Sequence, residues 1–164
     1  MTHHIVVMGV SGCGKSTIAA LLADRLGLEY VDADWMHPKA NVEKMQRGIA
    51  LDDEDRWPWL GAIAARMAAL RAQGRGCVVA CSALKRAYRD VLRDGREDVR
   101  FVHLSGPAEA IAPRLTGRDG HFMPGSLLAS QFAALEPPQA DERAIAVSVE
   151  LAPGEIVEAI VTSL

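Results

Sequence analysis

Residues 9–16 read Gly9-Val10-Ser11-Gly12-Cys13-Gly14-Lys15-Ser16. They match the pattern G-x-x-x-x-G-K-[ST], in which the backbone N–H groups of a glycine-rich loop surround phosphate oxygens. The apolar run 5–8 precedes the loop and predicts a buried strand, and 16–26 follows it with apolar residues at helical spacing. A strand, this loop and a helix in that order predict a phosphate-binding loop, to which the helix N-terminus adds its positive dipole end. The alternative is a glycine-rich turn with an incidental lysine.

The predicted loop assigns roles to individual side chains. Lys15 can reach the β- and γ-phosphates of a nucleoside triphosphate, so it is a catalytic candidate as well as a binding one. The Ser16 hydroxyl can ligate Mg²⁺. The nucleotide-binding candidates of this region are Gly9, Val10, Ser11, Gly12, Cys13, Gly14, Lys15, Ser16 and Thr17.

The bulk properties are those of one globular domain. The chain has 164 residues, which suits a single domain over 1–164 with a substantial core. Its net charge of −3 does not indicate broad nucleic-acid binding. No apolar stretch is long enough to span a membrane, and no signal peptide is expected because the chain enters a strand almost at once. We therefore expect a cytoplasmic protein with no membrane or nucleic-acid partner.

The three cysteines predict reduced thiols, because an odd number without a secretory signal is typical of cytoplasmic chains. Cys77 and Cys81 lie four residues apart in a predicted strand, about 13 Å by the strand rise, so they cannot bridge. We expect both to be core residues and not metal ligands.

Strand and helix patterns alternate along the chain, and this alternation predicts an α/β fold with a parallel sheet between helices. The predicted strands are 4–9, 28–32, 76–81, 99–104 and 144–149. The predicted helices are 15–26, 39–47, 57–73, 85–94, 107–116, 126–135 and 154–163. In such sheets ligands bind beyond the carboxyl ends of the strands, where the phosphate loop, Asp32, Asp34 and Ser82 all fall.

Two aspartates end the second predicted strand. If the chain stays extended there, alternation points Asp32 and Asp34 the same way. Asp32 could then hold Mg²⁺ through water, and Asp34 could bind the acceptor hydroxyl and take its proton. The alternative is a pair of turn-forming or helix-capping aspartates. His37 follows shortly and is a candidate hydrogen-bonder of the substrate.

Residues 51–59 read Leu51-Asp52-Asp53-Glu54-Asp55-Arg56-Trp57-Pro58-Trp59. Acids at a helix start favour the positive dipole end, which explains most of them, and the predicted helix 57–73 tolerates Pro58 in its first turn. Arg56 lies among acids and tryptophans, and its planar fork suits bidentate binding of a substrate carboxylate. An internal salt bridge to Asp52 or Asp53 explains Arg56 equally well.

The third predicted strand leads into a basic helix that faces the same crevice. Ser82 could contact the substrate through its hydroxyl. Lys85 is a substrate-binding candidate, and it lies four residues before Arg89 on one helical face. Both could equally be solvated charges.

Residues 117–125 are rich in glycine and carry basic groups, which is typical of a mobile lid, and we place the lid at about 117–126. Phosphoryl transfer needs water excluded and the charge on the γ-phosphoryl neutralised. Arg118 is the catalytic candidate of this segment, with Arg114 one helical turn earlier and His121 as a substrate-side candidate. An ordinary exposed loop is the alternative.

Together these residues resemble the gluconokinase family of small P-loop sugar-acid kinases, which is related to shikimate and nucleoside monophosphate kinases. The resemblance runs nearly end to end. Its more specific blocks are Asp55-Arg56-x-Pro58-Trp59-Leu60 and Cys81-Ser82-Ala83-Leu84-Lys85. The others are the phosphate loop from Met8, Asp32-x-Asp34-x-x-His37-Pro38, Asn41-Val42-Glu43-Lys44-Met45, and Gly120-His121-Phe122-Met123-Pro124 followed by Ser130-Gln131.

The resemblance implies a P-loop NTPase fold like that of nucleoside monophosphate kinases, with five parallel strands, a substrate-side region at about 34–60 and a lid. It implies the reaction ATP + D-gluconate → ADP + 6-phospho-D-gluconate, with Mg²⁺, in a homodimer. The related shikimate kinases take the metal-side carboxylate from the second strand, which matches Asp32. The wider group also places adenine between Arg114 and the segment near Pro153. Cys13 stands where a serine is common, and we expect no loss because only backbone N–H groups act there.

A P-loop switch protein of the Ras type is the alternative outside enzymes. Such proteins read guanine with Asn-Lys-x-Asp, and none of the four lysines here is followed two residues later by Asp. A nonspecific nucleotide-binding regulator stays open, as does a kinase for another small acceptor such as shikimate or a nucleoside monophosphate. The residues themselves predict phosphoryl transfer to a small acceptor, and the resemblance alone names gluconate.

Overall fold

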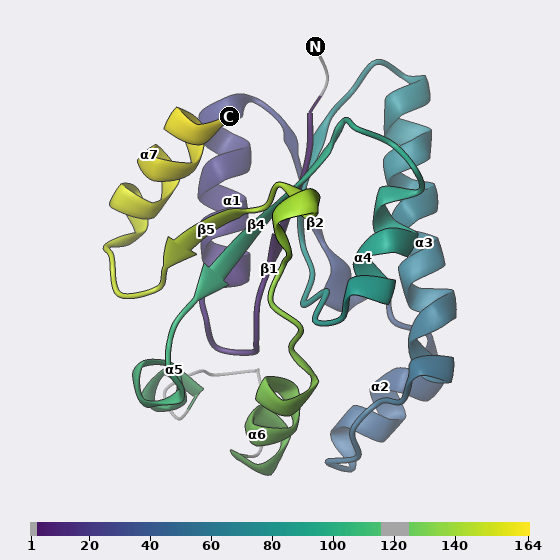
Figure 1. Ribbon diagram of the computed structural model, residues 1–164. Coiled ribbons are helices and arrows are strands. Elements are labelled where there is room, and N and C mark those ends of the chain that lie inside the picture. The colour runs from purple at the N-terminus through teal and green to yellow at the C-terminus, as the bar shows by residue number, and fades with distance from the viewer. Residues whose placement is uncertain (1–2, 116–124) are drawn as a thin grey trace.

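The computed structural model describes residues 3–115 and 125–164 and shows a parallel sheet with helices on both faces (Figure 1). β1 (His4–Met8) is the central strand of five, which are ordered β2-β3-β1-β4-β5. Each neighbouring pair is parallel. The remaining strands are β2 (Glu29–Asp32), β3 (Cys77–Ala80), β4 (Val99–Ser105) and β5 (Ile145–Ser148). The predicted five-stranded parallel α/β sheet is confirmed.

The helices divide between the two faces of the sheet and its carboxyl edge (Figure 1). One face carries α1 (Lys15–Leu26) and α7 (Pro153–Ser163), and the other carries α3 (Asp53–Ala72) and α4 (Arg86–Arg93). The carboxyl edge carries α2 (Lys39–Gln46), α5 (Ala108–Leu115) and α6 (Gly125–Ala134). The described chain also contains the 3-10 helices η1 (Ala33–Met36) and η2 (Ala140–Glu142). Within the two described ranges, no helix is both long and apolar enough to cross a membrane.

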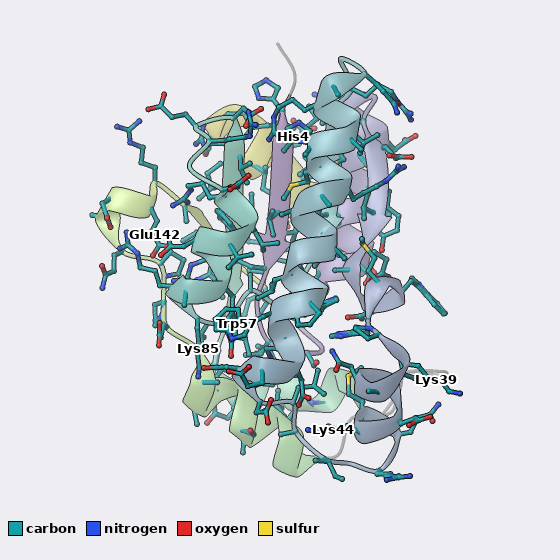
Figure 2. The ribbon with its side chains drawn as sticks, turned by 90° about the vertical axis from the view of Figure 1, so that its right-hand side faces the viewer. His4, Lys39, Lys44, Trp57, Lys85 and Glu142 are labelled. Atoms are coloured by element: carbon teal, nitrogen blue, oxygen red, sulfur yellow. The ribbon has the colours of Figure 1, made fainter. Side chains whose placement is uncertain are left out.

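Each face of the sheet has its own apolar core, because the central strand is buried on both sides. Ile5 and Val7 of β1 pack into the core under α1 and α7, and Val6 and Met8 pack into the core under α3. Cys77 and Cys81 belong to the second core, where both are buried and free as predicted. Figure 2 shows the α3 side of the molecule.

Helix α3 starts four residues before the predicted position. The Asp52 carboxylate accepts the N–H of Asp55 at 2.8 Å, and the Asp55 carboxylate accepts the N–H of Asp52 at 3.0 Å. This reciprocal capping box fixes the start at Asp53. Pro58 therefore lies in the second turn and not in the first, and the carbonyl of Glu54 has no helical N–H partner there. The acids occupy the first turn, as their dipole preference predicted.

Candidate active site

The phosphate loop connects the end of β1 to the start of α1, as predicted. Gly9, Gly12 and Gly14 have φ angles of +149°, +82° and +97°, which side-chain-bearing residues seldom adopt. A Cβ on Gly9 would lie 2.8 Å from Sγ of Cys13 and 2.9 Å from the carbonyl oxygen of Leu104, so the backbone there is closely packed. The loop therefore has the tight turn and the helix N-terminus that phosphate binding requires.

Among the described residues, two hydrogen bonds that involve side chains hold this loop. Nζ of Lys15 donates to the carbonyl of Val10 at 3.1 Å, so the amine lies across the loop. The backbone N–H of Ser11 donates to Oε1 of Gln131 at 2.6 Å. Gln131 belongs to α6 and lies 120 positions farther along the chain. From the sequence we predicted no role for it beyond its place in the Ser130-Gln131 pair.

The metal-side candidates Ser16 and Asp32 meet at the hydroxyl of Tyr30. This hydroxyl donates to Oδ2 of Asp32 at 3.1 Å. Burial raises the pKa of Tyr30, and a hydrogen bond with Ser16 acts to lower it. In the described part of the chain, no group of three or more His, Cys, Asp or Glu could hold a metal ion by itself. The pair fits Mg²⁺, which takes few protein oxygens and completes its octahedron with waters and phosphates.

The chain does not stay extended after Asp32. Oδ1 of Asp32 accepts the N–H of Asp34 at 3.0 Å and caps η1, so the capping alternative is correct for Asp32. The expectation that strand alternation orients the two aspartates is wrong, because the chain coils into a 3-10 helix at this point. Trp59 on α3 fixes η1, since its indole N–H donates to the carbonyl of Ala33 at 2.8 Å.

Several charged candidates act on the pKa of the Cys81 thiol, which lies at the carboxyl end of β3. Burial raises its pKa to about 12, the positive charge of Lys15 acts to lower it, and the negative charges of Asp34 and Asp32 act to raise it. These three candidates therefore lie at one end of the sheet. Strand ends that are far apart in the sequence supply them, as the parallel topology predicts.

His37 is held as a neutral imidazole. Its ring stacks on Trp59 with centroids 4.1 Å apart, and burial, with the positive charge of Arg56 as a second cause, lowers its pKa to about 4. Nδ2 of Asn41 donates to the carbonyl of Asp55 at 2.8 Å, which fixes the amide, and the same nitrogen lies 3.2 Å from Nδ1 of His37. Nδ1 must then accept, so the ring proton sits on Nε2 and is available to donate.

Arg56 is fixed by neutral groups. Its Nη1 donates to the carbonyl of Leu51 at 2.6 Å and to the hydroxyl of Tyr88 at 3.2 Å, and its guanidinium lies 5.3 Å from the centroid of the Tyr88 ring. Among the described residues, no carboxylate lies within ion-pair distance of Arg56, so the predicted alternative of a salt bridge to Asp52 or Asp53 is wrong. Its cation is thus positioned without being neutralised.

Tyr88 organises the charges beside Arg56. Its hydroxyl donates to Asp53, which also accepts from Nζ of Lys85 at 3.2 Å. Because a tyrosine hydroxyl has one proton, its oxygen is left to accept from Arg56. Trp57 packs edge-on against the Tyr88 ring, and Figure 2 shows Trp57 and Lys85 close together, far from His4. We predicted no role for Tyr88 from the sequence.

The segment after β3 meets the phosphate loop, since the carbonyl of Ser82 accepts the N–H of Gly9 at 3.2 Å. Lys85 is partly exposed and paired with Asp53. The solvated alternative is wrong for Arg89, whose side chain is fully buried against Glu142. The helical spacing of Lys85 and Arg89 did not reveal this difference, because the partner of Arg89 comes from another part of the chain.

Four candidates remain, two from the predicted lid and two for the adenine. Arg118 and His121, with most of the predicted lid, fall outside the described residues. Arg114 belongs to α5, whose backbone is described there while the Arg114 side chain is not. Pro153 is described, and it begins α7 just after the carboxyl end of β5, on the edge of the sheet that carries the phosphate loop.

Comparison with known proteins adds sequence relatives to this geometry. The pattern of the shikimate kinase family matches residues 11–133. A gluconokinase of Gluconobacter oxydans is 48% identical over 157 residues, which cover 96% of this chain and 88% of that protein.

Solved structures give the same result. A sugar kinase from Janibacter sp., solved without ligand, is 52% identical with a TM-score of 0.93, covering 99% of this chain and 94% of that one. A gluconokinase from Sinorhizobium meliloti 1021 is 44% identical with a TM-score of 0.88, covering 98% of this chain and 90% of that one. The similarity therefore extends over nearly the whole length of each chain.

Proposed function

The chain belongs to the gluconokinase family, within the wider shikimate kinase family, and on this premise we propose that it transfers the γ-phosphoryl group of ATP to D-gluconate. The product is 6-phospho-D-gluconate. The observation that carries the proposal is Arg56, a guanidinium held in place by the Leu51 carbonyl and the Tyr88 hydroxyl. Among the described residues it has no acid partner, so it is ready for the carboxylate of an anionic acceptor.

On the nucleotide side, the phosphate loop from Gly9 to Thr17 surrounds the phosphates with N–H groups. Lys15 leaves the Val10 carbonyl for the β- and γ-phosphates, where it offsets the charge that spreads over the transferred group. Ser16 directly and Asp32 through water would hold Mg²⁺, which would neutralise phosphate charge there. Arg114 and the Pro153 segment flank the adenine.

On the acceptor side, Asp34 orients a gluconate hydroxyl and takes its proton as that oxygen attacks the γ-phosphorus. The bond from phosphorus to the bridging oxygen of ADP breaks as the new one forms. Arg56 binds the carboxylate, and His37 donates a hydrogen bond from Nε2. Ser82 and Lys85 complete the acceptor contacts, with the Lys85 charge shared with Asp53.

In the lid, which we place at about 117–126, Arg118 neutralises the γ-phosphoryl and His121 contacts the substrate. The region 34–60 forms the acceptor side of a single domain. These assignments rest on the family motif and on the chemistry that phosphoryl transfer needs.

A coupled ADP-release assay tests the function. The panel contains gluconate, related aldonates, shikimate and nucleoside monophosphates, each with ATP and Mg²⁺. We expect gluconate to have the highest kcat/KM. A higher value for shikimate or a monophosphate would assign the enzyme to that acceptor, and thermal stabilisation by ATP without turnover of any acceptor would favour a regulator.

We also propose a homodimer that works in the cytoplasm. The dimer follows from the resemblance, and the three buried free cysteines suit a reducing compartment. Sedimentation equilibrium tests the dimer, since a mass near one chain at micromolar concentration would contradict it. Fractionation of cells that express the tagged protein tests its location.

A further inference from the structure

Arg89 of α4 and Glu142 of η2 form an ion pair whose two side chains have 0% exposure. Nε and Nη2 of Arg89 donate to the two carboxylate oxygens at 2.6 and 3.1 Å. Burial acts to raise the pKa of Glu142, but the hydrogen bonds from Arg89 and from the N–H of Gln139 outweigh it and the pKa is lowered. The pair is therefore ionised and rigid.

The guanidinium also holds a loop on its other side. Nη1 of Arg89 donates to the carbonyls of Ala83 at 2.9 Å and Leu84 at 3.1 Å. Ala83 has a φ of +44°, a conformation that costs an alanine energy and persists only where its surroundings impose it. Both loop residues are buried. The Leu84 carbonyl also accepts the N–H of Glu136 at 2.8 Å, whereas the Ala83 carbonyl would lose its described donor in an apolar setting without Arg89.

The loop 82–85 joins the two halves of the candidate site. At its start the Ser82 carbonyl accepts the N–H of Gly9 in the phosphate loop. At its end Lys85 pairs with Asp53, which accepts the Tyr88 hydroxyl that in turn accepts from Arg56. A shift of this loop would move the acceptor side relative to the phosphates.

We propose that Arg89 and Glu142 are positioning residues for the acceptor: their ion pair sets the backbone of 82–85 and thereby the Lys85–Asp53–Tyr88–Arg56 array. The inference rests on the proposed function for the identity of the acceptor. Neither side chain is open to solvent, so neither touches the substrate. A buried ion pair adds little net stability compared with apolar residues of similar size, which favours a role in geometry.

The test replaces the whole pair, because a single removal would leave one buried charge unpaired. Arg89→Met combined with Glu142→Leu removes both charges and keeps the volume filled. The matched control is Arg71→Met combined with Asp98→Leu, which removes a bidentate pair of 2.7 and 2.9 Å between the end of α3 and the segment before β4. That pair lies near His4, at the opposite end of the sheet.

We expect the Arg89/Glu142 variant to raise KM for gluconate about tenfold to a hundredfold, as small displacements of positioning groups do, and KM for ATP less than threefold. The control should change neither constant, whatever it does to the melting temperature. If the first variant does not fold, Arg89→Lys replaces it: the cation stays beside Glu142 but cannot reach both carbonyls and both carboxylate oxygens, and the same split is expected.

Unchanged KM for gluconate in a folded variant, or an equal rise in the control, would overturn the positioning role. Turnover of gluconate by the unmodified enzyme tests the proposed function separately. If the panel assigns another acceptor, KM for that acceptor is measured in the same two variants. The positioning role of Arg89 and Glu142 can therefore fail or hold independently of the proposed function.

Discussion

Arg56 shows how a single side chain acquires a function from its neighbours. The Leu51 carbonyl and the Tyr88 hydroxyl hold it, and no described acid neutralises it. The cation nearest to it in the array, Lys85, is paired with Asp53, and His37 is neutral because burial lowers its pKa to about 4. Arg56 is therefore the strongest described candidate for an acceptor carboxylate.

Replacing Arg56 should weaken the preference for an anionic acceptor. Losing a bidentate contact to a desolvated carboxylate costs about 2–5 kcal/mol, so Arg56→Ala should shrink the ratio of kcat/KM for gluconate to that for glucose, which lacks the carboxylate. Arg56→Lys keeps the charge without the fork and should still raise KM for gluconate. Steady-state kinetics with both sugars measures this.

The control is Arg66→Ala, on the same helix as Arg56, which removes an exposed pair with Glu29 of β2 and should leave the ratio as it is. An unchanged ratio in Arg56→Ala would mean that the carboxylate is bound elsewhere, with Lys85 the next candidate.

The two aspartates should separate by role. Asp34→Asn keeps the size of the side chain but removes the base, so kcat should fall about a hundredfold or more with little change in ATP binding. Asp32→Asn should instead alter the dependence on Mg²⁺ concentration. Kinetics at varied Mg²⁺ distinguishes them, and wild-type turnover by Asp34→Asn alongside an inactive Asp32→Asn would reverse the assignment.

Among the elements, α6 is tied to the phosphate loop by a hydrogen bond from the Ser11 N–H to Gln131. Gln131→Glu would place a carboxylate on this N–H, which binds it more strongly than an amide does and repels a triphosphate. We expect KM for ATP to rise about tenfold and KM for gluconate to stay constant. The matched control is Gln73→Glu, at the end of α3, which adds the same charge at an exposed position away from the loop and should change neither constant. A wild-type KM for ATP in Gln131→Glu would refute the coupling.

Local signals predicted most elements and failed at two points, the start of α3 and the chain just after Asp32. Helix α1 begins and ends where apolar spacing placed it, at Lys15 and Leu26. The start of α3 was missed because the Asp52–Asp55 capping box outweighs the preference of Pro58 for a first turn. The expected extension beyond Asp32 failed because its carboxylate caps η1.

The candidate site residues could be predicted from the sequence better than the distant residues that hold them in place. Parallel topology brings Lys15, Asp32, Asp34 and Ser82 to one edge, so sequence alone located them. Gln131 binds the N–H of Ser11, and Glu142 pairs with Arg89. Each lies more than 50 positions from its partner in the sequence, and no local pattern encodes such a pairing. Which cation is buried, Lys85 or Arg89, depends on such a partner.

At the scale of the whole molecule, three histidines in separate places respond alike to acid. Burial lowers the pKa of His4, His37 and His103, and positive arginines act in the same direction on each. For example, His4 has 0% exposure and lies beside Cys77, and its Nε2 has no hydrogen-bond partner among the described residues.

A lowered folded pKa means that below about pH 6.5 the unfolded chain binds protons that the folded chain does not. The stability that each neutral histidine contributes to the folded protein is therefore complete above pH 6.5 and is lost as the pH falls. For each histidine protonated only in the unfolded chain, the free energy of unfolding should fall by at most about 1.4 kcal/mol per pH unit. Urea unfolding between pH 7.5 and 5.0 measures the slope, and His103→Gln should reduce it. The carboxylate of Asp98, whose pKa is lowered first by Arg71, adds its own loss only nearer pH 4. A free energy of unfolding that stays level or rises from pH 7.5 to 5.0 would show that these rings take up protons inside the folded protein.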